Sequence, residues 1–343
     1  MSRIKVLVVD DSAFARKVLR EVLQAAGIQV VAIARDGLEA LEQIAALEPD
    51  VVALDLVMPN LDGIGVLRAL QSFPSERAPR VVVVSTSDAD SGMGIEALQA
   101  GAVNIVHKPT ALATAQLYEL QESLVLAVRE AALARNIARR SSTPPALTLL
   151  PQPQTRTRLL VVGTSTGGPH ALAQLLAAVP AGFPVPLAIA LHIPAGYTEE
   201  LAKRLDRSSA IDVVEAHEGL MLRPGLAVLA RGGQHLTLSG AADSLRAHIG
   251  YLALTEPHRP SVDLLFESAA QCVGAQVLAV VLTGMGNDGL RGARAIHAAG
   301  GRILTESEDS CIVYGMPGVV MQEGLAIAEA HIDDMAAVIV RHL

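Results

Sequence analysis

The chain has 343 residues, enough for two domains of ordinary size, and 51% of them are apolar. Its formal net charge of −8 argues against nucleic acid as the main partner, because phosphate backbones attract basic proteins. The chain lacks an apolar run near the roughly 18 residues of a membrane span, a signal-peptide pattern and a disulfide framework, so we expect a cytoplasmic protein without membrane insertion.

Residues 1–110 alternate short Val-rich runs with segments of helical period. The runs are IKVLVVDD, VVAIARDG, VVALDLVMP, RVVVVSTSD and NIVHKP, and amphipathic stretches such as FARKVLREVLQAAG separate them. Continuous apolar strands separated by helices predict a parallel sheet that is covered on both faces. Such units make a small doubly wound domain, whose functional sites lie at the carboxyl ends of the strands.

Polar residues follow four of these predicted strands. Asp10 and Asp11 end the first strand, Asp55 the third, Ser85 the fourth and Lys108 the fifth. Three carboxylates without a soft ligand suit a hard cation such as Mg²⁺, and Asp55 could attack a phosphate donor. Acids that simply begin loops would explain any one of these residues, but explain the whole set poorly.

The constellation resembles the receiver domain of two-component response regulators over about residues 1–125. The motifs VVDDS, ALDLVMPNLDG, VVVVS and HKP match that family's pattern. The resemblance implies that Asp55 accepts a phosphoryl group from a chemotaxis-type histidine kinase and that the three carboxylates hold Mg²⁺. It also makes Ser85 and Lys108 the phosphate-sensing residues. Ile105 departs from the pattern, because many receivers have an aromatic residue three positions before the lysine.

The second half of the chain is predicted to form another α/β domain. Residues 126–157 comprise the end of a helix and a linker, SSTPPALTLLPQPQTRTR, in which prolines and hydroxyl residues break all periodicity. Residues 158–343 carry the apolar runs RLLVVG, VPLAIALHIP, AIDVVEA, GLAVLA, HLTLSG and QVLAVVLTG, with a hairpin or two expected near 225–255. We therefore expect a flavodoxin-like five-stranded domain followed by a Rossmann-like, mostly parallel hydrolytic domain.

The stretch VVGTSTGGPHALAQLL could hold a phosphate, mount a nucleophile or simply connect a strand to a helix. A P-loop needs a lysine after its glycines, but Pro169 and His170 stand there, and the dinucleotide spacing also fails. The residues GTSTG fit G-x-S-x-G, the turn that exposes a serine at a sheet edge, here Ser165. A plain tight turn remains an alternative from this stretch alone.

A serine nucleophile needs a base and an orienting carboxylate. His192 follows the apolar run VPLAIAL and precedes Pro194, at the expected end of a strand. Asp288 follows QVLAVVLTGMGN, just ahead of a new helix, where a helix N-cap is the alternative interpretation. A histidine satisfied within the core is the alternative for His192. Together the three positions predict a triad of Ser165, His192 and Asp288.

Longer motifs are similar to the catalytic domain of the chemotaxis protein-glutamate methylesterases (CheB-type). They are GTSTGGP, LHIPAGYTEELAKRLD, HRPSVDLLFESAA, LTGMGNDGLRGARAI and YGMPGVV. The resemblance covers essentially the whole chain and implies a Ser165 nucleophile, a His192 general base and acid, and Asp288 as its partner. It also implies that Thr166 assists near the nucleophile and that the backbone N–H of Met285 helps bind the oxyanion.

The resemblance further implies the substrate and its control. The substrate would be glutamyl methyl esters on the helical cytoplasmic region of chemoreceptors, with receptor glutamines deamidated as well, and the unphosphorylated receiver would cover the active cleft. The esterase reaction needs no metal or cofactor. Leu191, Ile193 and Arg231 depart from the family pattern near the expected cleft wall. These departures leave open an alternative in which the protein serves receptors of another chemosensory pathway.

Two other functions remain open from the sequence. The C-terminal domain could be a non-enzymatic output module in which the three residues only form turns and caps, or a serine hydrolase with another substrate. A DNA-binding regulator fits poorly, because the C-terminal half is acidic and carries no helix-turn-helix pattern. We expect a monomer.

Overall fold

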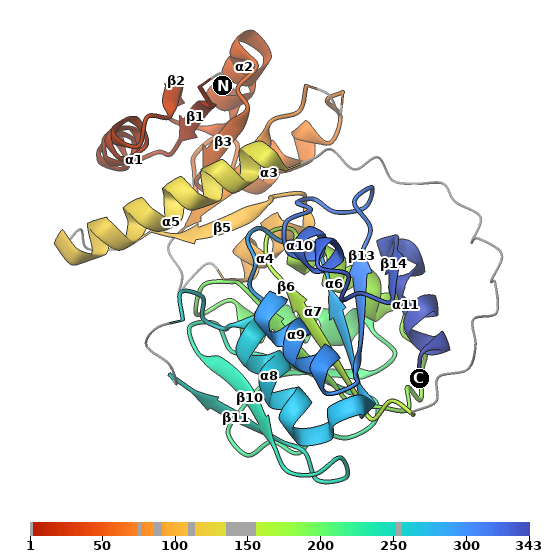
Figure 1. Cartoon of the computed structure of the whole chain (residues 1–343). Helices are drawn as coiled ribbons and strands as arrows, with labels where there is room; N and C mark the ends of the chain where they lie inside the picture. The colour runs from red at the N-terminus through yellow and green to blue at the C-terminus, as the bar shows by residue number, and fades with distance from the viewer. Residues whose placement is uncertain (1–2, 75–76, 86–90, 109–113, 135–155, 252–255) are drawn as a thin grey trace. The chain divides into compact units, whose positions relative to one another are not determined.

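The computed structural model (Figure 1) divides into two compact units, residues 1–136 and 137–343, here called the N-terminal and C-terminal units. It describes residues 3–74, 77–85, 91–108, 114–134, 156–251 and 256–343. Most of the predicted linker lies outside these residues.

The described part of the N-terminal unit contains a five-stranded parallel sheet in the order β2-β1-β3-β4-β5. Its strands are β1 (Lys5–Val9), β2 (Gln29–Ala34), β3 (Val51–Leu54), β4 (Arg80–Ser85) and β5 (Asn104–His107). Its helices are α1 (Ala13–Ala25), α2 (Gly37–Leu47), α3 (Gly63–Leu70), α4 (Ser91–Gln99) and α5 (Thr114–Leu133). This strand order is that of the flavodoxin-like doubly wound fold, so the predicted fold is confirmed.

Side-chain caps start three of these helices at the carboxyl edge of the sheet. Ser12 accepts a hydrogen bond from the amide of Ala15, Asp36 from that of Glu39, and Asp62 from that of Gly65. Such caps satisfy amides that have no partner within the helix. The loops that carry Asp10, Asp11 and Asp55 therefore each end at a side-chain cap of the following helix.

The described part of the C-terminal unit contains a seven-stranded sheet in the order β14-β13-β12-β6-β7-β9-β8, with every neighbouring pair parallel. Its strands are β6 (Leu159–Thr164), β7 (Leu187–Leu191), β8 (Asp212–Glu215), β9 (Leu226–Leu229), β12 (Val277–Val281), β13 (Arg302–Glu306) and β14 (Ala328–Ala330). A separate antiparallel hairpin joins β10 (His235–Ser239) to β11 (Arg246–Gly250). The predicted parallel sheet and hairpin are both present.

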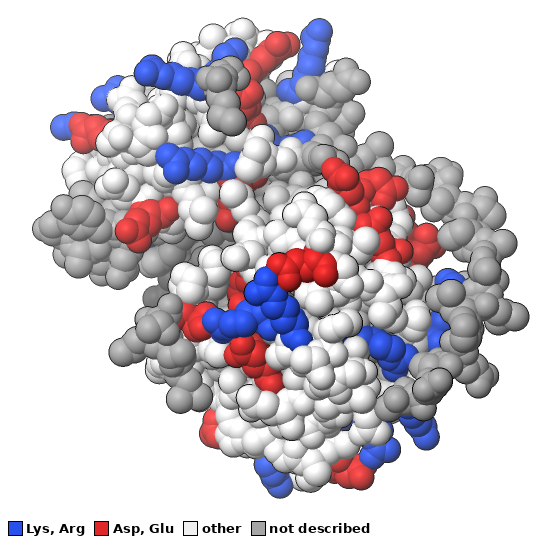
Figure 2. Space-filling model, viewed as in Figure 1, with Lys and Arg blue, Asp and Glu red and all other residues white. Residues whose placement is uncertain are grey.

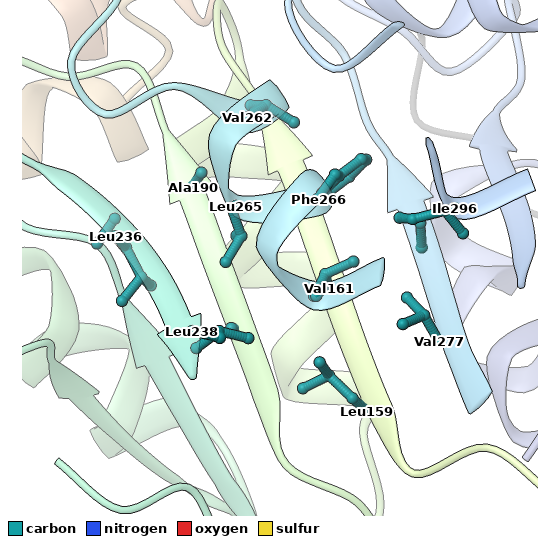
Figure 3. Close-up of a cluster of buried hydrophobic side chains, with 14 of the residues drawn as sticks. Leu159, Val161, Ala190, Leu236, Leu238, Val262, Leu265, Phe266, Val277 and Ile296 are labelled. Atoms are coloured by element: carbon teal, nitrogen blue, oxygen red, sulfur yellow. The ribbon is translucent and has the colours of Figure 1, made fainter. Parts of the chain in front are cut away.

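Helices connect the strands of this sheet and cover it. They are α6 (Gly168–Ala178), α7 (Thr198–Ser208), α8 (Val262–Val273), α9 (Leu290–Ala298), α10 (Met316–Gln322) and α11 (Ile332–Arg341), with a short 3₁₀ turn, Gly274–Gln276, after α8. Figure 3 shows α8 lying over the sheet, with Leu265 and Phe266 among buried side chains such as Val161 of β6 and Val277 of β12. This packing places the first turn of α8 near the carboxyl ends of the strands.

The two cysteines are free thiols, Cys272 half-buried and Cys311 buried. Burial raises the pKa of both thiols, which keeps them protonated and poorly reactive. Among the described residues, no helix has the length and apolar character needed to cross a membrane.

Candidate functional site

The G-x-S-x-G turn joins β6 to α6 directly. Ser165 follows the last residue of β6 and is 7% exposed, and α6 begins at Gly168. Gly167 has φ +81°, a left-handed conformation that residues with a Cβ rarely adopt, so the sharp reversal requires glycine there. Pro169 then stands in the first turn of α6, where its fixed φ fits. The sequence thus presents the serine at the carboxyl edge of the sheet.

His192 lies beside the serine turn because β6 and β7 are neighbours. Thr164 and Leu191 are register partners, so Ser165 and His192 are the residues that follow a paired position on each strand. The amide of His192 donates to the carbonyl of Thr164 at 3.2 Å. Sheet pairing alone therefore brings these two predicted residues to the same edge.

Asp288 completes a buried histidine–carboxylate pair. The Nε2 of His192 lies 2.7 Å from Oδ2 of Asp288. The same carboxylate accepts hydrogen bonds from the amides of Val262 (2.8 Å) and Asp263 (2.9 Å) and from the hydroxyl of Ser261 (3.1 Å). Burial by itself raises the pKa of Asp288, but His192 and these amides lower that pKa well below its usual range. The carboxylate is thus held ionised against the imidazole.

The alternative interpretation of Asp288, an N-cap of the helix that follows it, is not what the structure shows. The N-cap of α9 is Gly289, which makes no side-chain cap. Asp263 takes that role, because its Oδ1 accepts hydrogen bonds from the amides of Gly289 (2.9 Å) and Gly292 (2.7 Å). Asp288 instead accepts hydrogen bonds from the first amides of α8. Each acid therefore caps the helix on which the other acid lies or which directly follows it. Burial, with a contribution from Asp288, raises the pKa of Asp263 to about 6.

Thr283, which was not predicted as a site residue, anchors the serine turn on both sides. Its carbonyl accepts hydrogen bonds from the amide of Ser165 (3.1 Å) and the hydroxyl of Thr164 (2.7 Å). Its own hydroxyl donates to the carbonyl of Thr166 (3.0 Å). Glu306, at the end of β13, accepts from the amide of Thr283 (2.7 Å), and burial raises the pKa of this carboxyl to about 7.

The loop after Thr283 lies directly against the nucleophile. A Cβ placed on Gly284 would lie 2.8 Å from the Cβ of Ser165 and 2.4 Å from the Sδ of Met316, so only glycine fits. Met285 follows Gly284 in this loop and is half-buried. The predicted oxyanion residue Met285 is therefore one position from a residue in contact with Ser165, while Thr166 is the next residue along the turn.

His258 packs on the candidate base and was also missed. The rings of His192 and His258 are stacked, with centroids 4.3 Å apart and an interplanar angle of 15°. Burial and the neighbouring His192 lower the pKa of His258, so it favours the neutral form. His258 opens the motif HRPSVDLLFESAA, but no apolar run precedes it, so its position gave no sign of a strand end.

A polar cleft of about 290 Å³ lies beside this pair. Its lining includes His258, Asp288 and two arginines of α9, Arg291 and Arg294. Figure 2 shows basic and acidic side chains intermixed on this face. The ion pairs join Arg291 to Glu256 and Glu267, and Arg294 to Glu323. The cleft is suited to a polar segment of substrate.

In the N-terminal unit the polar strand-end residues also meet. The Nζ of Lys108 lies 2.5 Å from Oδ2 of Asp10 and 3.0 Å from Oδ2 of Asp55. Burial raises the pKa of Asp55 and Lys108 opposes this shift. Ligand oxygens of Asp10, Asp11 and Asp55 all lie within 4.8 Å of one another, and the buried Ser85 ends β4, where its carbonyl accepts from the amide of Lys108 (2.8 Å). This all-oxygen set fits a hard divalent cation.

The residues that depart from the family pattern have different environments. Ile105 is buried in β5 of the N-terminal unit, and Leu191 and Ile193 are buried on either side of His192. Arg231 is exposed, with its Nε 3.9 Å from Oε2 of Glu215. None of them replaces a group of the candidate triad.

Comparison with known proteins identifies both units. The CheB methylesterase family model matches residues 160–339, and the response regulator receiver domain model matches residues 6–119. A protein-glutamate methylesterase/protein-glutamine glutaminase 5 from Myxococcus xanthus is 57% identical over 348 residues, which cover 100% of this chain and 99% of that protein. A protein-glutamate methylesterase/protein-glutamine glutaminase from Halalkalibacterium halodurans is 39% identical over 342 residues, covering 99% and 98%.

A solved structure supports the same assignment for the C-terminal unit. The crystal structure of the Thermotoga maritima CheB methylesterase catalytic domain matches with a TM-score of 0.53 and 33% identity, covering 55% of this chain and 100% of that one. The resemblance inferred from the motifs is thus confirmed. The chain belongs to the CheB methylesterase family and carries a response regulator receiver domain ahead of its methylesterase domain.

Proposed function

We propose that this chain hydrolyses the methyl esters of glutamate side chains in chemoreceptors and also deamidates their glutamines. The names of its relatives give protein-glutamate methylesterase and protein-glutamine glutaminase activities for those proteins. The observation that carries the proposal is the buried His192–Asp288 pair, whose carboxylate is held by the amides of α8. The substrate would be the helical cytoplasmic region of the receptor, and the protein would act in the cytoplasm during chemotaxis adaptation.

The geometry supports a serine-hydrolase mechanism. Because Nε2 of His192 faces Asp288, the neutral ring presents Nδ1 as the basic nitrogen. Ser165 Oγ attacks the ester carbonyl carbon while its proton passes to Nδ1, and a tetrahedral oxyanion forms. We assign its stabilisation to the backbone N–H of Met285, with Thr166 assisting at the turn.

Collapse of the tetrahedral adduct breaks the C–O bond, and the histidine proton leaves with methanol. Water then attacks the acyl-Ser165 ester, gives its proton to His192 and releases the glutamate carboxylate and free serine. A glutamine substrate follows the same course, with ammonia in place of methanol. Throughout the cycle Asp288 stays ionised and compensates the positive imidazolium.

We further propose that phosphorylation of Asp55 by a chemotaxis-type histidine kinase increases this activity. Mg²⁺ held by Asp10, Asp11 and Asp55 would neutralise the oxygens of the incoming phosphoryl group. Lys108 already contacts Asp10 and Asp55, so a phosphoryl group on Asp55 would draw its ammonium to new oxygens. Ser85 stands at the adjacent strand end to donate its hydroxyl.

The test is methanol release from membranes that hold methyl-labelled chemoreceptors. We expect release by the full chain, a further rise with a small-molecule phosphodonor and Mg²⁺, and none from Ser165→Ala. Asp55→Asn should keep basal release and lose the rise. If the full chain releases no methanol from any receptor while a serine-directed reagent still labels Ser165, the protein is a hydrolase with another substrate.

A further inference from the structure

The β10–β11 hairpin has one buried and one polar face. Leu236, Leu238 and Ala247 are buried in the core beneath it. Alternation along the strands puts Ser239 and His248 on the opposite face, where Thr237 is the register partner of His248. A serine and a histidine therefore lie diagonally across two paired strands, away from the candidate triad residues at the carboxyl ends of β6, β7 and β12.

Hydrogen bonds connect these two side chains to a carboxylate, that of Glu218. The Oγ of Ser239 is 2.6 Å from Nε2 of His248, and Nδ1 of His248 is 2.6 Å from Oε1 of Glu218. The second oxygen of Glu218 accepts a hydrogen bond from the amide of Ile249 at 2.8 Å. This amide and His248 lower the pKa of Glu218, so the ionised carboxylate accepts a hydrogen bond from Nδ1–H of His248. The neutral ring then presents Nε2 to the serine hydroxyl as a base.

Backbone pairing holds Glu218 in this place. The amide of Gly219 donates to the carbonyl of Ala247 (2.9 Å), and the amide of Ala247 donates to the carbonyl of Leu220 (2.8 Å). Residues Gly219 to Met221 thus pair with β11 through these backbone hydrogen bonds and an isolated antiparallel bridge between Met221 and Arg246. Arg246, the register partner of Ser239, donates from its guanidinium to the carbonyl of Gly219 at 3.2 Å, which keeps a positive charge at this face.

We propose that Ser239, His248 and Glu218 form a second Ser–His–carboxylate site that accepts acyl groups from small activated esters, such as aryl esters. Ser239 Oγ attacks the carbonyl carbon, the bond from that carbon to the aryl oxygen breaks, and the serine proton passes through His248 to the leaving phenolate. Arg246 offers positive charge to the oxyanion. Water hydrolyses the acyl-serine in a second step, with His248 again as the base.

The openness of the site sets its substrate class. The side chains of His248 and Glu218 are 40% and 63% exposed, so water screens their charges and little surface is available to orient a substrate. Only an ester with a good leaving group would react under these conditions. We therefore expect a methyl ester on a receptor helix to react at Ser165, and an aryl ester to react at Ser239.

The test uses the full chain with Ser165→Ala, treated with p-nitrophenyl acetate and analysed by peptide mass spectrometry. We expect acetylation at Ser239, and an added His248→Gln substitution should lower its rate by about 100-fold, the lower end of the usual contribution of a general base. Glu218→Gln should lower it by a smaller factor. Ser244, an exposed serine of the same hairpin turn, is the matched control and should stay unmodified.

Two outcomes would overturn the proposal. One is no acetylation of Ser239 while the chain remains folded by circular dichroism. The other is acetylation of Ser239 and Ser244 at equal rates that do not respond to His248→Gln, which would show ordinary surface reactivity.

Discussion

The pairs His192–Asp288 and His248–Glu218 have nearly the same length, 2.7 and 2.6 Å, yet their surroundings differ. The side chain of Asp288 is 6% exposed and accepts three further hydrogen bonds, whereas that of Glu218 is 63% exposed and accepts one further amide. Charges interact more strongly where water is excluded. The comparison teaches that a short distance defines a pair, while burial and additional donors determine how strongly it acts.

The largest expected effect is the loss of methylesterase activity when the His192–Asp288 pair is altered. Asp288→Asn should lower the rate of methanol release by about 10⁴-fold, because an amide does not compensate the imidazolium or fix its tautomer. Single-turnover rates with methyl-labelled receptors measure this effect. Asp263→Asn, a neighbouring acid without contact to the imidazole, is the control for folding. Retention of a tenth of the wild-type rate by Asp288→Asn would remove Asp288 from the proposed triad.

The next effect concerns stability. Asp288→Ala leaves the first amides of α8 and the ring of His192 without their buried acceptor, so it should reduce the free energy of unfolding by about 3 kcal/mol. Glu218→Ala should cause no measurable change, since exposed pairs are screened by water. Urea unfolding of the two full-length variants makes the comparison. Equal losses would show that burial does not distinguish the pairs.

Glu306 is a third carboxylate, and it is buried. The groups that shift its pKa include no basic residue. Burial raises the pKa of Glu306 to about 7, so from about pH 4.5 to 7 the folded chain holds a proton that the unfolded chain has lost. The stability contributed by this group is therefore present below pH 4.5 and is lost as the pH rises through 7. Glu306→Gln removes that loss.

We expect the melting temperature of Glu306→Gln, relative to wild type, to rise between pH 5 and pH 8. Thermal melts at several pH values measure it. Glu323→Gln, which alters an exposed carboxylate paired with Arg294, is the control and should show no such rise. A flat difference for Glu306→Gln would mean that this acid is already ionised at pH 5.

The smallest expected effect is on the methylesterase reaction itself. Glu218→Gln should leave methanol release within about twofold of wild type, because an exposed pair outside the triad contributes little. The same variant should slow aryl-ester labelling of Ser239, so the two assays separate the two sites. A tenfold loss of methanol release would instead tie the hairpin to the ester reaction.

Polar residues at predicted strand ends indicated much of the acidic site in the N-terminal unit and of the candidate triad in the C-terminal unit. In parallel sheets the carboxyl ends of neighbouring strands share one edge, so Asp10, Asp55 and Lys108 could be grouped from short apolar runs alone. The G-x-S-x-G turn indicated Ser165 and the apolar run before His192 indicated the base, and the structure shows that both residues follow register partners on β6 and β7. These predictions needed only the period of the strands and the topology of the doubly wound fold.

The remaining parts of the site depend on contacts between distant segments. The local sequence around Asp288 suggested a cap for α9, but the acid binds amides of α8, 25 and 26 positions earlier. The stacking of His258 on His192 joins two loops and follows no periodic pattern. Glu306 does end an apolar strand, so the strand-end argument could have included it, but its hydrogen bond to Thr283 depends on the course of the neighbouring loop.

The shared acceptor at Asp288 has a consequence for heat inactivation. One carboxylate holds both the first turn of α8 and the ring of His192, so when that turn frays the imidazole loses its orientation in the same event. Helix ends open at a lower free energy than the central strands of a sheet. Catalytic activity should therefore disappear a few degrees before the global melting transition, and residual activity would report the local opening of one helix end.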